Sequence, residues 1–173
     1  MLHMNSRIGQ LLHADHLTTL GTLQGLEELL VRQGAQAPDL KRAEVRDSLE
    51  KLVGVVKGEV GRHFGFEENH LFPVLAEAGQ VGMTMLLISE HRVILPVAEA
   101  AAKLAEEALV AGAFTPEAWA EFREAGMEFC ERELFHIQKE EMGLLAAVAA
   151  LIEPEADAAL AETFERLHEA PVA

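Results

Sequence analysis

Apolar residues recur every three or four positions along four long stretches of this chain, which is the spacing of amphipathic helices. Segments containing glycine or proline interrupt the pattern at residues 34–38, 79–82 and 112–116. We therefore predict long helices over about residues 6–32, 39 to 73 or 76, 83–110 and 116–152. Because short connections join successive helices, the chain is expected to form an all-α, up-down-up-down antiparallel four-helix bundle.

Capping residues support these helix boundaries. Asp39 is a candidate N-cap for the second helix, and Thr115 followed by Pro116 is a common beginning of a helix. Pro96 lies inside the third helix. It is expected to kink this helix without ending it, since the apolar period continues beyond it.

The chain is expected to form one domain over residues 1–173. The bundle occupies about residues 6–152, and Pro154 begins a short extra helix over about residues 154–168. A chain of 173 residues is long enough to bury a sizeable core. Half of the residues are hydrophobic and tyrosine is absent, which also favours a helical protein.

The chain is strongly acidic, with 29 acidic and 14 basic residues and a formal charge of −15. This charge argues against nucleic acid and anionic membranes as partners. Cys130 is the only cysteine, which excludes an intrachain disulfide and a zinc-thiolate cluster. We recognise neither a transmembrane run nor a secretion signal, and therefore expect a cytoplasmic protein.

Two stretches share the spacing His-x-x-x-Glu, namely His63 to Glu67 and His136 to Glu140. An acid-histidine pair precedes each stretch at a similar distance. His16 of the first pair lies 47 positions before His63, and His91 of the second lies 45 positions before His136. The chain therefore resembles one helix-pair unit written twice.

These polar residues are predicted to meet in one layer of the bundle. In an antiparallel hairpin, two residues lie at the same height when the midpoint between them falls in the turn. The midpoints between successive candidates lie at about residues 40, 78 and 114, which is in or within about two residues of the helix breaks described above. The layer would contain six inward-facing side chains, which are His16, His63, Glu67, His91, His136 and Glu140.

Four imidazoles and two carboxylates suit a pair of cations, with each carboxylate bridging both. Iron, manganese and zinc all fit such donors. A single buried histidine is more often a hydrogen-bonded core residue. Six inward-facing donors at one height favour a metal site, because two buried carboxylates without a cation would be strongly disfavoured.

Residues next to these candidates receive different predictions. Glu68, Glu141, Asp15 and Glu90 are expected mainly on the surface, since they point about 100° away from the ligand arc. Glu133, one turn before His136, is expected to support the ligands.

His70 lies on the ligand arc, and His13 lies at the same height on the first helix. These two histidines form a hydrogen-bonded second layer, or His70 supplies a third nitrogen to the ion of His16 and His63. His3 and His168 lie near the termini and are expected to be exposed.

A stripe of glycines follows the outer face of the second helix, and it comprises Gly54, Gly58, Gly61 and Gly65. Glycines inside a helix are unfavourable, so we expect another element to approach this face closely. The C-terminal helix and a partner subunit in a homodimer are the two candidates.

The motifs together resemble the hemerythrin-like, or HHE cation-binding, domain family over about residues 8–150. The matching stretches are Leu12 to His16, His63 to Pro73, Glu90-His91 and His136 to Glu141. The resemblance implies two non-haem iron ions with a bridging oxo or hydroxo species, in a four-helix bundle that binds O2, NO or peroxide. It also implies that His16 and His63 hold one iron, His91 and His136 hold the other, and Glu67 and Glu140 bridge them.

Two departures from the oxygen-carrying members affect the expected function. Leu95 stands where they have a second histidine on the third helix, and Glu140 stands where they have aspartate. Sensing of a small diatomic ligand or peroxide and iron handling therefore stand beside oxygen binding. A di-iron oxidoreductase for peroxide or NO detoxification and a structural zinc or single-metal bundle are the alternatives.

Overall fold

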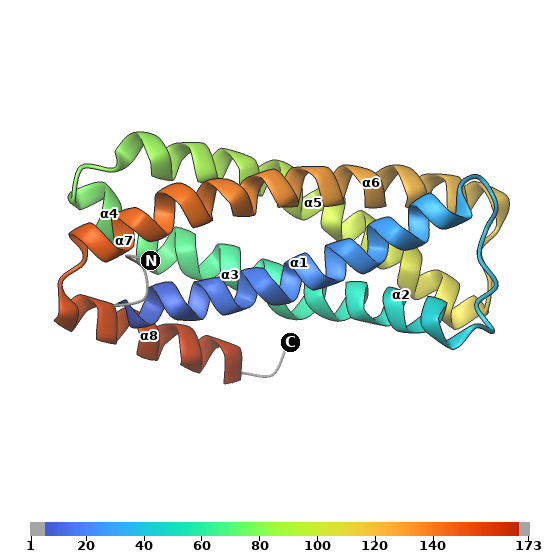
Figure 1. Cartoon of the computed structure of the whole chain (residues 1–173), viewed down its shortest axis with the longest axis horizontal. Coiled ribbons are helices and arrows are strands. Elements are labelled where there is room, and N and C mark those ends of the chain that lie inside the picture. The colour runs from blue at the N-terminus through green and yellow to red at the C-terminus, as the bar shows by residue number, and fades with distance from the viewer. Residues whose placement is uncertain (1–5, 170–173) are drawn as a thin grey trace.

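Four long helical rods make up most of the chain (Figure 1). The computed structural model describes residues 6–169, and no strand occurs among them, which confirms the predicted all-α fold. The first and third rods are single helices, α1 (Arg7–Gln33) and α5 (Val81–Ala111). A shorter helix, α8 (Pro154–Glu169), follows the fourth rod.

The second and fourth rods contain π-helical turns, labelled η. The segments of the second rod are α2 (Ala43–Val55), η2 (Val56–Val60), α3 (Gly61–Phe66), η3 (Glu67–Leu71) and α4 (Phe72–Glu77). Those of the fourth rod are α6 (Pro116–Lys139), η4 (Glu140–Leu144) and α7 (Leu145–Leu151).

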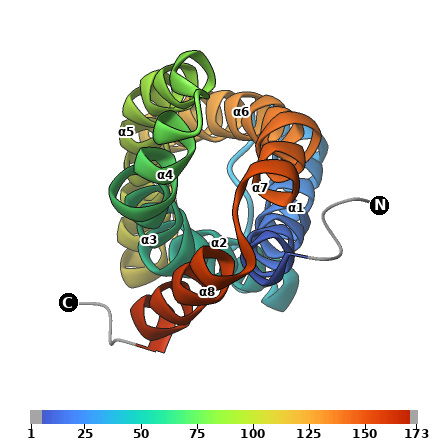
Figure 2. The same cartoon turned by 90° about the vertical axis from the view of Figure 1, so that its left-hand side faces the viewer.

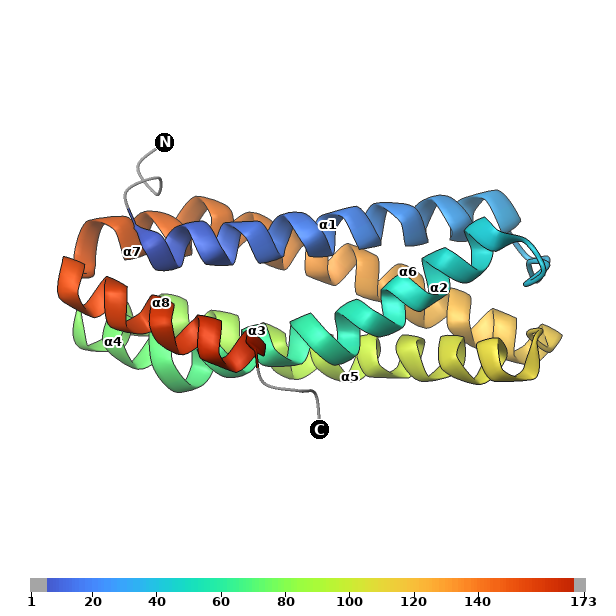
Figure 3. The same cartoon turned by 90° about the horizontal axis from the view of Figure 1, so that it is seen from below.

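Successive rods lie side by side and are joined at alternate ends (Figures 1 and 3). Viewed along their length, they surround a common axis (Figure 2). The α8 helix lies outside this arrangement and packs on α1 and α3. Side chains from all four rods can therefore meet along the axis.

Capping explains where several helices begin. The Ser6 and Thr115 side chains accept hydrogen bonds from Gly9 N and Ala118 N, at 2.9 and 3.1 Å, and Pro116 is the first residue of α6 as predicted. The prediction for Asp39 is wrong. Its carboxylate accepts from Lys41 N at 2.9 Å and forms a local turn, so α2 begins only at Ala43.

Buried apolar side chains form two clusters along the axis. One cluster, near the loops between α1 and α2 and between α5 and α6, includes Leu49, Phe122 and Phe129. The other, near the opposite end, includes Leu12 and Phe72. On each rod the predicted metal ligands lie between residues of the two clusters, so a polar layer separates two hydrocarbon regions.

The glycine stripe does not mark a close contact within the described chain. A Cβ atom at Gly54, Gly61 or Gly65 would meet no atom within 4 Å, and one at Gly58 would meet only the Arg62 side chain. The expected close approach of the C-terminal helix is therefore wrong. Although α8 contacts α3, it leaves these Cα positions open.

The α5 helix bears on the expectation that the chain contains no transmembrane run. By length and composition alone it qualifies as a candidate membrane span, and 28% of its most apolar 18-residue window is buried. Met85 and Leu86 are two of its large apolar side chains that face solvent, at 66% and 50% exposure. The helix also packs along α6, α2 and α4, and a core helix passes the same test.

Gly54→Ala should raise the free energy of unfolding by about 1 kcal/mol, because alanine is favoured over glycine in a helix. Gly126→Ala is the matched control, since its Cβ would lie 3.0 Å from Leu30 Cδ1 and the packing should cancel the gain. Urea unfolding measures both. A less stable Gly54→Ala protein would show that this face is not open.

Candidate metal centre

The six predicted donors converge in the polar layer. His16, His63, Glu67, His91, His136 and Glu140 are each at most 6% exposed. Glu140 Oε2 lies 3.0 Å from His16 Nε2, and its Oε1 lies 3.0 Å from His136 Nε2. Glu67 Oε1 and Oε2 lie 3.3 Å from His63 Nε2 and 3.4 Å from His91 Nε2. Each carboxylate thus presents one oxygen to each pair of histidines.

Among the described residues, donor atoms within 4.8 Å of one another form two groups. One contains Glu67, His91, His136 and Glu140, and the other contains His16, His63 and Glu140. We refer to them as the His91/His136 half and the His16/His63 half. Their sharing of Glu140 places two potential cation positions next to each other.

Local backbone structure orients both carboxylates. Each His-x-x-x-Glu spans one α-helical turn, which brings the imidazole and the carboxylate to the same face. A π-helical turn begins at each glutamate, and Phe72 N and Leu145 N donate to Glu67 O and Glu140 O, five residues back. Such turns are rare in proteins in general, and many of those that occur lie at functional sites.

Several buried polar atoms in the layer have no hydrogen-bond partner in the described chain. These are His16 Nε2, His63 Nε2, and both carboxylate oxygens of Glu67 and of Glu140. Buried polar atoms are normally satisfied, and an unsatisfied one costs about 1–3 kcal/mol. Cations between them would satisfy all six atoms. The donor set, imidazole nitrogen with carboxylate oxygen, suits iron, manganese or zinc.

Electrostatics in the layer show the same demand for positive charge. Burial lowers the pKa of His16, but contacts with the Glu140 and Glu141 carboxylates outweigh it and raise the pKa to about 9. Burial likewise opposes the shift at His91, where contacts with Glu140 and Glu67 raise the pKa to about 10. Without metal, protons on these imidazoles balance the carboxylates, and a bound ion takes their place.

Each of the four histidines in the layer uses its outer nitrogen, Nδ1, to donate a hydrogen bond to a carboxylate of another rod. His16 Nδ1 lies 2.6 Å from Glu141, and His91 Nδ1 lies 2.8 Å from Glu68. His136 Nδ1 lies 2.9 Å from Glu90 and His63 Nδ1 lies 3.3 Å from Asp15. We call Asp15, Glu68, Glu90 and Glu141 the carboxylate ring. Such partners fix the orientation of a ligand histidine and the nitrogen that it presents to the ion.

The expectation that these four acids are mainly surface residues is therefore wrong. A side chain about 100° from the inward direction points toward the adjacent rod rather than toward solvent. Successive rods run in opposite directions. The residue before the ligand on one rod and the residue after the ligand on the next rod therefore point the same way around the bundle. The signal in the sequence was an acid beside His16, Glu67, His91 and Glu140.

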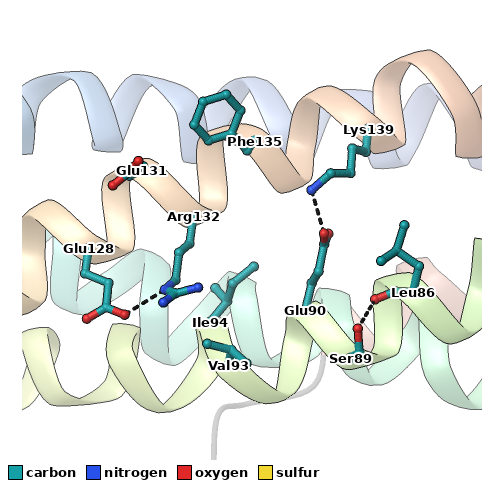
Figure 4. Close-up of a pocket in the computed structure, with 10 residues that line it drawn as sticks. All are labelled: Leu86, Ser89, Glu90, Val93, Ile94, Glu128, Glu131, Arg132, Phe135 and Lys139. Carbon is teal, nitrogen blue, oxygen red and sulfur yellow. Dashed lines mark hydrogen bonds and ion pairs between the residues drawn. The ribbon is translucent and has the colours of Figure 1, made fainter.

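Three members of the ring have a second partner. His13 Nδ1 lies 3.0 Å from Glu141, and His168 Nε2 lies 3.1 Å from Asp15. Figure 4 shows Lys139 on α6 pointing toward Glu90 on α5, and Lys139 Nζ donates to Glu90 Oε1 at 2.5 Å. The expectation that His168 is simply exposed is therefore wrong.

His70 lies outside both groups of donors. Its side chain is exposed, and its ring centroid lies 5.8 Å from that of Phe66. The π-helical turn after Glu67 explains this, because it takes more residues per turn and rotates His70 away from the ligand arc. The expectation that His70 supplies a third nitrogen is not supported. His13 serves Glu141, so the alternative of a His13–His70 layer is not supported either.

The two halves have different surroundings. The His91 ring stacks on Phe64, with centroids 3.8 Å apart, and lies 5.7 Å from the Phe72 ring. The His16/His63 half instead borders a hollow of about 10 Å³, close to the smallest space that holds one water molecule. Glu133 lines this hollow and is 3% exposed, and its Oε2 has no hydrogen-bond partner among the described residues. Burial raises the pKa of Glu133 to about 7.

The raised histidine pKa values predict how the metal-free protein responds to pH. A group whose pKa is raised by folding stabilises the fold fully below its unfolded pKa, here 6.5. That contribution is lost as pH rises through the folded value, about 9 for His16 and about 10 for His91. Urea unfolding at pH 6 and pH 10 should therefore show a loss of roughly 3 kcal/mol from His16 alone.

The metal-loaded protein is the control for this experiment. Ions bind imidazole only after its proton leaves, so loading should make stability rise with pH between about 5 and 7. A metal-free protein whose stability stays constant from pH 6 to pH 10 would contradict the proposed charge balance.

Residues 7–148 match the family model of the hemerythrin HHE cation binding domain. No curated protein and no solved structure matches the chain. The matched range contains all six donors and the carboxylate ring, and it ends before α8 begins at Pro154. Because this match covers most of the 173 residues, the chain belongs to the hemerythrin HHE cation-binding domain family.

Proposed function

We propose that this protein binds two iron ions in a hemerythrin-type, up-down-up-down four-helix bundle and uses them to engage O2, NO or peroxide. The observation that carries the proposal is the sharing of Glu67 and Glu140 between two pairs of buried histidines. His16 and His63 would hold one ion, His91 and His136 the other, and the two glutamates would bridge them.

The type of donors favours iron over a structural zinc site, because the layer contains imidazoles and carboxylates and no thiolate. Each ion would receive two imidazole nitrogens and one oxygen from each bridging glutamate. A structural zinc site is usually complete with four protein ligands and is commonly rich in cysteine. Iron in the same place would supply electron transfer and positions for a small ligand, which a purely structural ion does not need.

The surroundings of the His16/His63 half favour it as the place where a small ligand enters. The hollow there borders both histidines, and the rings of Phe64 and Phe164 meet His63 only edge-on, whereas the Phe64 ring stacks flat on His91. Glu133 lines the hollow and can donate a hydrogen bond when its carboxyl carries a proton. The residues around the hollow would orient a ligand of two or three atoms.

A second candidate function is reduction of peroxide or NO with electrons from an external reductant. The observation in its favour is Glu133, a buried acid whose pKa of about 7 suits delivery of a proton near neutral pH. The same side chain would stabilise a bound ligand without turnover if the protein only binds or senses it.

His63→Ala and His136→Ala should each reduce the bound iron by at least one ion per chain, because each removes a nitrogen donor and leaves buried carboxylates less compensated. Metal analysis after anaerobic loading with Fe(II) measures the change. His70→Ala is the matched control, since this histidine is exposed and lies outside both groups.

A wild-type protein that retains about two irons with a charge-transfer band supports the proposal. Zinc alone, with no response to NO or peroxide, would favour the structural alternative. Normal iron content in both His63→Ala and His136→Ala would exclude these residues as ligands.

Glu133→Gln should lower the rate of peroxide consumption by iron-loaded protein, supplied with a chemical reductant, by about 10²-fold or more if Glu133 delivers a proton. Glu131→Gln, on the same helix but exposed, should leave the rate unchanged. An equal rate in Glu133→Gln and wild type would exclude this role. A wild type that binds NO without consuming peroxide would favour binding over catalysis.

A further inference from the structure

The α8 helix lies outside the residues that match the family model, yet its C-terminal end reaches the polar layer. His168, near its C-terminal end, places Nε2 3.1 Å from Asp15 Oδ2. The same oxygen lies 3.3 Å from His63 Nδ1. A chain of contacts therefore runs from α8 through Asp15 to a proposed ligand of the His16/His63 half.

Two further side chains, Phe164 and Arg62, hold this end of α8 against the residues around His63. Phe164 is 3% exposed and meets the His63 ring edge-on, with centroids 6.3 Å apart. It also stacks on His168, at 4.0 Å between centroids. Arg62 donates to the carbonyl oxygens of Leu167 and His168, at 3.3 and 2.9 Å. The position of His168 is thus set from both sides.

Other contacts fasten α8 to α1 without involving His168. Asp157 accepts from the Ser6 hydroxyl and, at 2.8 Å, from Arg7 N. Glu165 pairs with Arg7 at 2.6 Å. Docking of α8 and the contact of His168 with Asp15 can therefore be disturbed separately.

Among the four members of the ring, Asp15 makes the weakest contact with its histidine, judged by distance. It is one methylene shorter than the three glutamates, and its 3.3 Å contact with His63 is the longest of the four. His13 and Lys139, the second partners of Glu141 and Glu90, both come from the rods. Only Asp15, among the described contacts of the ring, receives its second partner from α8.

We propose that α8 positions His63, through His168 and Asp15, and so controls how firmly the His16/His63 half holds its ion. His168 pins Asp15 Oδ2, and Asp15 in turn holds the Nδ1–H of His63 so that Nε2 faces the ion. This makes the two ions unequal in this protein. The inference rests on the proposed two-metal function.

The test compares His168→Ala with Glu165→Gln in protein loaded with Co(II) alone. Release of the two ions to a chelator and the visible Co(II) absorption bands are recorded together. In His168→Ala, one ion should leave about tenfold faster than in wild type and the bands of one site should shift, while the other ion is unaffected. Glu165→Gln breaks a different contact of α8 and should leave both ions as in wild type.

Two more variants separate positioning from folding. His168→Gln keeps a side-chain N–H that can donate to Asp15 and should restore most of the slow release. Asp15→Asn should accelerate loss of the same ion, and adding His168→Ala to it should change little, because both act through one contact. Helix content by circular dichroism verifies that each variant is folded.

Three outcomes would overturn the inference. The first is wild-type release of both ions from a folded His168→Ala protein. The second is an equal effect of His168→Ala and Glu165→Gln, which would mean that only docking of α8 matters. The third is a wild-type protein that binds fewer than two ions per chain, both when loaded with Co(II) and when loaded with Fe(II). This result would overturn the proposed function and this inference with it. Two bound ions with an unchanged His168→Ala protein would overturn the inference alone.

Discussion

Two glutamate side chains, Glu67 and Glu140, lie at the centre of this protein almost without contact with water, and the surrounding structure supplies the positive charge that they require. Four imidazole nitrogens face their oxygens, one from each rod. Protons or metal ions can provide the charge, and either choice changes the stability of the fold. This coupling between charge and folding makes cation binding the natural function of the layer.

The carboxylate ring extends the same electrostatic logic outward. Each rod gives one histidine to the centre and one acid to a neighbour, so a contact runs from every rod to the next around the bundle. Two hydrocarbon clusters would pack in more than one rotation or register. The ring adds directional contacts that only one arrangement satisfies, and we infer that it helps to align the rods.

The two halves of the layer differ mainly in what surrounds them. Their donors are similar, since each half has two histidines and both include Glu140, while Glu67 faces a histidine of each half. The differences lie outside the donors, where aromatic rings cover His91 while a hollow and Glu133 border the His16/His63 half. The α8 helix adds His168 on that same side. The surroundings therefore distinguish two groups of similar donors.

The sequence by itself determined the helical elements, most of their ends and the six residues of the central layer, because helical period and turn position fix direction and height. It did not determine the partners of side chains such as Asp15 and Glu141, which depend on which rod lies beside which. The outward rotation of His70 required the π-helical turn, whose hydrogen bonds no residue spacing reveals. The contact between His168 and Asp15 joins residues 153 positions apart, so only the packing of α8 on α1 and α3 decided it.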